Sequence, residues 1–142
     1  MSIWMPYAWM ELGQKEIAGD ADNPRIIEYH SATTLKATDD EVPWCSSFVN
    51  WCMRKAGLVG TGSAAARSWL TWGVDGVLEY GEVAVISRGS NPEQGHVAFL
   101  LDMNKDWVWL LGGNQHDSVS VSRFPRASLL DCRRSPATGD RT

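Results

Sequence analysis

The chain has 142 residues, 44% of them apolar and 21% charged, and its 13 basic and 17 acidic residues give a formal net charge of −4. This composition predicts one globular domain over residues 1–142 with a single hydrophobic core, and it excludes a disordered chain. Because no basic stripe stands out, nucleic acid is not expected as a partner. No apolar run approaches the ~18 residues of a membrane-spanning helix, so membrane insertion is not expected either.

The amino terminus lacks the basic segment and uninterrupted apolar stretch of a secretory signal peptide. We therefore expect synthesis in the cytoplasm and, if the protein acts elsewhere, a separate route of release. The three cysteines are a poor basis for a disulfide framework. Cys52 and Cys132 could pair in principle, but buried free thiols are the expected state.

Helix signals occur throughout the first half of the chain. Asn23 is a typical helix cap, and Pro24 suits the first helical position. Pro43 precedes a segment whose apolar residues recur at helical spacing on one face, and Gly57 is its stop signal. The expected helices cover residues 6–17, 24–32, 45–56 and a short segment that Ser63 caps and that ends near residue 73.

From Gly81 onward the pattern changes to short apolar segments separated by turn-rich loops. The expected strands cover residues 82–86, 95–101, 106–111, 118–122 and 129–133, with the segment 112–115 breaking the third. Their close spacing predicts an antiparallel meander. Helices first and strands second make an α+β domain, in which the helices pack against the sheet. The polar tail from Ser135 is expected to be frayed.

Three residues along the chain have the properties of a nucleophile, a base and an orienting group. Cys45 stands at a helix start, where the positive end of the helix dipole favours the thiolate. His96 opens an apolar strand directly after a glycine and could act as the general base. Asn114 follows two glycines and could accept a hydrogen bond from the imidazole, with Gln115 and His116 as competing candidates.

The polar segment 33–42 precedes the helix that carries the cysteine and contains three adjacent acidic residues at 39–41. We interpret it as a solvated loop. An alternative is that one of these carboxylates lines the substrate groove or binds a cation. Three adjacent acids lack the alternating spacing of a calcium loop, so no metal site is predicted here.

Four short blocks of the sequence resemble the CHAP/NlpC-like superfamily, in particular a family of small phage and bacterial CHAP-like proteins. The blocks are Pro43-Trp44-Cys45-Ser46-Ser47-Phe48-Val49-Asn50-Trp51, Gly62-Ser63-Ala64-Ala65-Ala66-Arg67-Ser68-Trp69, Gly95-His96-Val97-Ala98 and Gly112-Gly113-Asn114-Gln115. The resemblance implies a papain-like α+β fold. It also implies hydrolysis of an amide bond in peptidoglycan, with Cys45 as nucleophile, His96 as base and Asn114 as the third residue, without metal or organic cofactor.

Several functional details follow from this resemblance as expectations. Trp44, Ser63, Trp69 and Gln115 are expected to contact the substrate. The scissile bond is either the amide between glycan and peptide or a bond within the stem peptide. A phage endolysin released through a holin is the expected setting. The alternatives are a secreted antibacterial effector with an immunity protein as partner, a cysteine amidohydrolase of another substrate, and a non-catalytic binding module.

Overall fold

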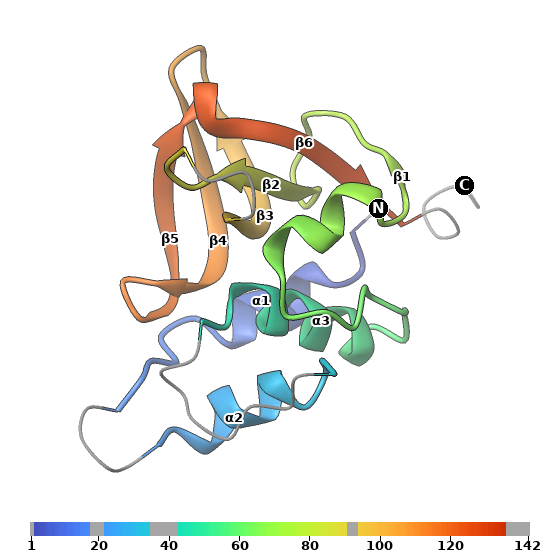
Figure 1. Ribbon diagram of the computed structural model, residues 1–142, viewed down its shortest axis with the longest axis vertical. Helices are drawn as coiled ribbons and strands as arrows, with labels where there is room; N and C mark the ends of the chain where they lie inside the picture. Colours follow the sequence, from blue (N-terminus) through green and yellow to red (C-terminus); the bar gives the residue numbers. More distant parts are fainter. Residues whose placement is uncertain (1, 18–21, 35–42, 91–93, 136–142) are drawn as a thin grey trace.

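The computed structural model describes residues 2–17, 22–34, 43–90 and 94–135, and in it a layer of helices lies against one side of a curled antiparallel sheet (Figure 1). The helices are α1 (Met5–Met10), α2 (Pro24–His30), α3 (Cys45–Lys55) and the 3-10 turns η1 (Ala66–Thr71) and η2 (Arg126–Ser128). The strands are β1 (Val74–Asp75), β2 (Val83–Ser87), β3 (Gly95–Met103), β4 (Trp107–Gln115), β5 (Ser118–Pro125) and β6 (Leu129–Arg134). This mixture of helices and antiparallel sheet agrees with the predicted α+β class.

The predicted starts of α2 and α3 are confirmed, but the first helix is shorter than expected. The Asn23 side chain accepts a hydrogen bond from the backbone N–H of Arg25 at 2.9 Å, as a cap should. The first helix ends at Met10 instead of residue 17, because the chain after it pairs with β5. Gly13 donates to the carbonyl of Val119 at 2.9 Å, and Val119 donates back to Gln14 at 2.7 Å. Tertiary pairing therefore overrides the helical spacing in this segment.

The sheet has the strand order β1-β6-β2-β3-β4-β5. Strands β2 to β5 form the predicted meander, in which each strand pairs with the next. The last strand, however, crosses back to pair with β2 on the other side, and the short β1 extends that edge. Residues 112–115 were expected to break the third strand, and the structure corrects this because β4 continues through them to Gln115.

Helix α3 lies at the centre of the molecule. All residues from 45 to 53 are buried, so the helix is enclosed on all sides and is not a surface helix with one apolar face. It packs against β3 and β4 on one side and against α2 on the other (Figure 1). Its first turn is thereby held at the end of the sheet where β3 begins and β4 ends.

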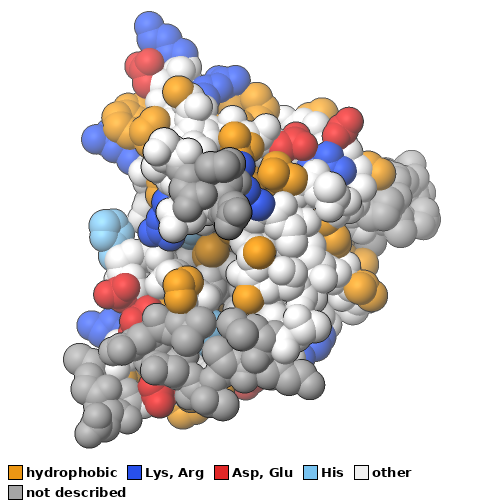
Figure 2. Space-filling model, in the orientation of Figure 1, with side chains coloured by type: hydrophobic (Ala, Val, Ile, Leu, Met, Phe, Trp, Pro, Cys, Tyr) orange, Lys and Arg blue, Asp and Glu red, His pale blue; other side chains and the backbone are white. Residues whose placement is uncertain are grey.

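Two features of the described residues bear on binding partners: the distribution of charge and the lengths of the helices. Acidic and basic side chains are interspersed over the described part of the face in Figure 2. Among the described residues, no helix is both long and apolar enough to cross a membrane.

Two expectations fall on residues that the structure does not describe. The tail that was expected to fray consists of residues 136–142 apart from Ser135, and the acidic residues 39–41 also lie outside the described residues.

Candidate active site

Cys45 is the first residue of α3, and its side chain is 5% exposed. The first N–H groups of a helix have no acceptor within the helix, so they present partial positive charge at this end. Helix formation starts here because the Trp44 carbonyl accepts the N–H of Phe48 at 2.9 Å and closes the first turn. The sulfur therefore lies at a position that stabilises negative charge on it or on a bound substrate.

The surroundings of Cys45 favour its thiolate. Burial is the largest influence and by itself raises the pKa of the Cys45 thiol. A hydrogen bond from His96 and its charge, the backbone N–H of Val97 and the charge of Arg88 act in the other direction and leave the pKa below the ordinary thiol value. The other two thiols behave oppositely, because burial raises the pKa of Cys132 to about 11 and that of Cys52 well above its usual range.

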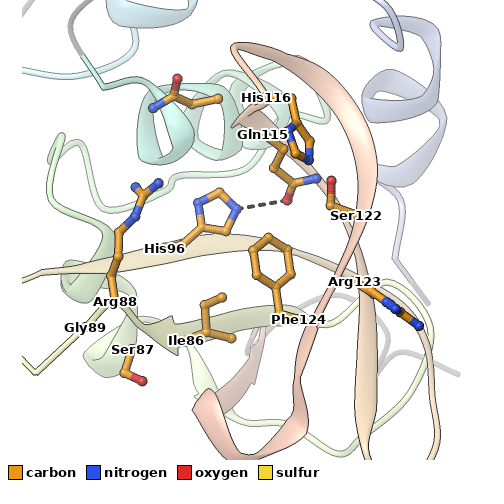
Figure 3. Close-up of a pocket in the computed structure, with 11 residues that line it drawn as sticks. Ile86, Ser87, Arg88, Gly89, His96, Gln115, His116, Ser122, Arg123 and Phe124 are labelled. Atoms are coloured by element: carbon orange, nitrogen blue, oxygen red, sulfur yellow. Dashed lines mark hydrogen bonds between the residues drawn. The ribbon is translucent and has the colours of Figure 1, made fainter.

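The hydrogen bonds of Gln115 determine which nitrogen of His96 carries the proton. The Gln115 Nε2 donates to the carbonyls of Leu110 at 3.1 Å and Ser120 at 2.7 Å, and both can only accept. This orients the amide oxygen toward His96, whose Nε2 lies 2.9 Å away (Figure 3). Nε2 must therefore be the donor, and in the neutral ring Nδ1 is left with a lone pair for Cys45. His96 has the tautomer that a general base requires.

The structure therefore assigns the orienting hydrogen bond to Gln115 and not to Asn114. The register of β4 against β5 shifts by one residue between Gly112 and Gln115, so β4 contains a bulge. Asn114 lies in this bulge with a left-handed backbone, φ 59°. One extra residue reverses the alternation of side chains beyond it, which places Gln115 on the face where Asn114 would otherwise point. Asn114 and His116 both line the cavity beside His96.

The two glycines before the bulge are required by close packing. A Cβ atom on Gly113 would lie 2.7 Å from the Trp44 ring and 2.8 Å from the Cβ of Phe48. A Cβ atom on Gly112 would lie 2.7 Å from the Gln115 amide oxygen. Gly113 thus allows β4 to approach the start of α3, and Gly112 leaves room for the amide that holds His96.

A cavity of about 520 Å³ opens beside His96. Figure 3 shows His96, Gln115 and Phe124 meeting at its centre, with the His96 ring 5.3 Å from the ring of Phe124. The cavity provides space for a substrate next to the imidazole. The described residues that line it are Ile86, Ser87, Arg88, Gly89, His96, Asn114, Gln115, His116, Ser122, Arg123 and Phe124.

Two of the expected substrate contacts do not fit their positions in the structure. Trp44 and Trp69 have no exposed surface, so they cannot touch a substrate. Their indole N–H groups donate to Glu16 at 2.8 Å and to the Ser46 hydroxyl at 2.9 Å, respectively. They are buried because both large rings belong to the main hydrophobic core. Both tryptophans are therefore part of the core that packs around Cys45 and do not form a substrate-binding surface.

Ser63 belongs to a polar network that fixes the loop before η1 to α3. Its carbonyl accepts from the Ser46 hydroxyl at 2.6 Å and from the Asn50 amide at 3.1 Å. The Asn50 oxygen in turn accepts the N–H of Gly62 at 2.8 Å. Sequence reasoning missed this role of Asn50, although its spacing of four residues from Ser46 places both on one side of the helix.

Within the part of the chain that the structure describes, no group of three His, Cys, Asp or Glu side chains could hold a metal ion. The acidic residues 39–41, considered above as a possible cation site, are outside that part. Cys45, Cys52 and Cys132 are all free thiols.

The geometry agrees with the relationship found for the sequence. Residues 37–114 match the family described as the CHAP domain, so the match includes Cys45 and His96 and ends one residue before Gln115. No curated protein matches the chain. Because the family match covers more than half of the sequence, the protein belongs to the CHAP-domain family, whose members are generally peptidoglycan amidases and peptidases.

Proposed function

We propose that this protein hydrolyses an amide bond of peptidoglycan through a Cys45 thiolate and a thioester intermediate. The observation that carries the proposal is that His96 lowers the pKa of the Cys45 thiol and is itself hydrogen-bonded to Gln115, with Cys45 at the start of a buried helix. Such a series supplies a nucleophile, a base of defined tautomer and a group that orients the base. It is the arrangement expected for a papain-like cysteine hydrolase.

The reaction follows from the positions of these groups. The Cys45 thiol gives its proton to Nδ1 of His96, the resulting thiolate attacks the amide carbonyl, and the carbonyl oxygen becomes an oxyanion. The N–H of Cys45 at the helix start is suited to stabilise that oxyanion, an interaction for which removal of one donor costs on the order of 10²–10³ in rate. His96 gives its proton to the leaving amine, then accepts a proton from water as water attacks the thioester and releases the carboxylic acid.

Two finer parts of the proposal are which amide bond is cut and how the protein reaches the cell wall. The proposed bond is either the N-acetylmuramoyl-L-alanine amide or an amide within the stem peptide. The proposed setting is a phage endolysin that reaches the wall after holin-type release. A secreted antibacterial effector with an immunity protein as partner is the alternative, and genes next to this one, for a holin or for an immunity protein, would separate the two.

The experiment is digestion of purified cell walls followed by mass spectrometry of the fragments. New amine and carboxyl termini identify the bond that was cut. Cys45→Ala and His96→Ala are each expected to abolish release of fragments, while Cys52→Ala, a change at another buried thiol of the same helix, keeps the activity. Near-normal activity of either site variant, or intact walls with the parent protein, would falsify the proposal.

A further inference from the structure

The cavity beside His96 has a positive character that the chain as a whole lacks. Among the described residues that line it, two are arginines and none is acidic. The complete chain carries a formal net charge of −4. A cationic recess in an acidic protein indicates that a negatively charged group binds there.

Arg88 is the cationic side chain best placed to meet such a group near the reacting atoms. It directly follows β2 and lines the same cavity as His96, and in the view of Figure 3 its guanidinium is on the side of the His96 ring away from Gln115. The charge of Arg88 also acts on Cys45 and helps to lower the pKa of its thiol. Arg88 is exposed and makes no ion pair or hydrogen bond with any other residue that the structure describes.

Arg123 lines the same cavity, but its guanidinium is in contact with another side chain. Its guanidinium lies 4.1 Å from the centre of the Trp107 ring, in cation–π contact. Figure 3 shows it pointing away from His96. Arg123 is therefore a matched control, because it has the same charge and lines the same cavity but is turned away from the reacting groups.

We propose that Arg88 binds a carboxylate of the substrate close to the scissile amide, so that the enzyme selects acidic peptides. This inference rests on the proposed function and adds a specificity-determining residue to it. A guanidinium forms two parallel hydrogen bonds with a carboxylate, whereas a carboxamide offers one acceptor and no charge. The substrate carboxylate takes the place of the protein carboxylate that Arg88 lacks among the described residues.

A second role for Arg88 must be separated from this one. Its charge also favours the Cys45 thiolate, so its removal would lower the rate for every substrate by a common factor. Substrate selection predicts a different result, because only substrates with the carboxylate lose rate. The ratio of kcat/KM between two substrates that differ only in this group therefore reports selection and is unaffected by thiolate stabilisation.

The test uses muropeptides whose glutamyl residue carries either a free carboxylate or a carboxamide. The parent protein should prefer the carboxylate by roughly tenfold or more in kcat/KM, as expected for a charge-assisted pair. Arg88→Gln should bring the ratio close to one, Arg88→Lys should retain part of the preference, and Arg123→Gln should keep it. Equal rates of the parent on both substrates, or an unchanged ratio in Arg88→Gln, would overturn the inference.

A binding measurement separates this inference from the proposed reaction. In a Cys45→Ala background the same two muropeptides can be titrated calorimetrically without turnover. The carboxylate form should bind roughly tenfold more tightly, and Arg88→Gln should remove the difference. Equal affinities, or no binding of either form, count against Arg88 as the carboxylate site. Failure of the parent protein to cleave walls counts against the proposed function alone.

Discussion

Gln115 differs from a carboxylate as a partner for His96. Its amide oxygen fixes the tautomer and the orientation of the ring but adds no negative charge to stabilise the imidazolium. The two carbonyls that accept from its Nε2 prevent the amide from turning over. At this site, His96 is therefore positioned by hydrogen-bond geometry, and the thiolate of Cys45 is favoured by His96, the backbone N–H of Val97 and the charge of Arg88.

The first prediction concerns the reactivity of Cys45 as a function of pH. The rate of alkylation by iodoacetamide should rise with pH to a plateau whose midpoint lies below that of free cysteine, because the pKa of Cys45 is lowered. His96→Ala should move the midpoint upward, because burial raises the pKa of Cys45 and the variant lacks the side chain that lowers this pKa most. Mass spectrometry of the labelled peptides measures both, and an identical midpoint in the variant would contradict the pairing.

Cys52 and Cys132 provide the internal control for this measurement. Burial raises the pKa of both thiols, so neither should react near neutral pH in the folded protein. Labelling should be confined to Cys45 and should disappear in Cys45→Ala. Labelling of Cys52 at a similar rate would show that the native protein opens, and the alkylation midpoint would then not describe the site.

The second prediction separates Gln115 from Asn114. Gln115→Ala should lower kcat by roughly 10- to 100-fold, because the imidazole loses the partner that orients it. Asn114→Gly is the matched change, since glycine tolerates the backbone φ of 59° and removes only the side chain. It should retain most of the activity on purified walls. A larger loss in Asn114→Gly than in Gln115→Ala would return the orienting role to Asn114.

At the scale of secondary-structure elements, the site depends on the contact between the start of α3 and the end of β4. The glycine pair allows this contact, and the bulge directs the Gln115 side chain toward His96. Both features are local departures from regular strand geometry. The bulge therefore determines which side chain is hydrogen-bonded to His96, because a regular strand would present Asn114 to the histidine instead.

The third prediction tests this contact through Gly113→Ala. The added methyl group would lie 2.7 Å from the ring of Trp44, which is enclosed in the core and cannot move aside without cost. Overpacking of this kind typically destabilises by about 1–3 kcal/mol. Denaturant unfolding should show the loss, and the alkylation rate of Cys45 at neutral pH should fall as α3 is displaced. Unchanged stability together with unchanged Cys45 reactivity would show that the contact is not tight.

At the scale of the whole molecule, α3 is held from several directions at once. β3 and β4 support one side and α2 the other, while the Asn50 network ties the helix to the loop before η1. Buried polar groups on an enclosed helix are stable only when they are hydrogen-bonded, and Ser46 and Asn50 meet this condition. The position of Cys45 relative to His96 is thus a property of the complete fold.

The fourth prediction concerns Asn50→Ala. The change removes hydrogen bonds to Ser46, Ser63 and Gly62 and leaves buried groups without partners. The free energy of unfolding should fall by roughly 1–3 kcal/mol. Val59→Ala, at a side chain that is 87% exposed, serves as the control and should change stability little. Equal unfolding midpoints for the two variants would show that the network contributes nothing to stability.

Short-range signals in the sequence determined the starts of two helices, the positions of most strands and the candidate nucleophile and base. Caps and prolines predicted where α2 and α3 begin, and hydrophobic periods predicted strands β2 to β6 to within a few residues, apart from the longer carboxyl ends of β4 and β5. The candidate nucleophile and base were also predictable, because a helix start and a strand start are local features that Cys45 and His96 occupy. Each of these properties depends on a stretch of about ten residues.

Only the tertiary structure decided how these parts meet. Gln115 is the residue hydrogen-bonded to His96 because a single extra residue in β4 reverses the alternation of side chains, and no periodicity reveals such a bulge. Trp44 and Trp69 support the site without touching its cavity, because their burial depends on what covers them. Arg88 faces His96 because the end of β2 lies beside the start of β3. These three features depend on contacts between residues far apart in the sequence, and such contacts cannot be predicted from a local sequence pattern.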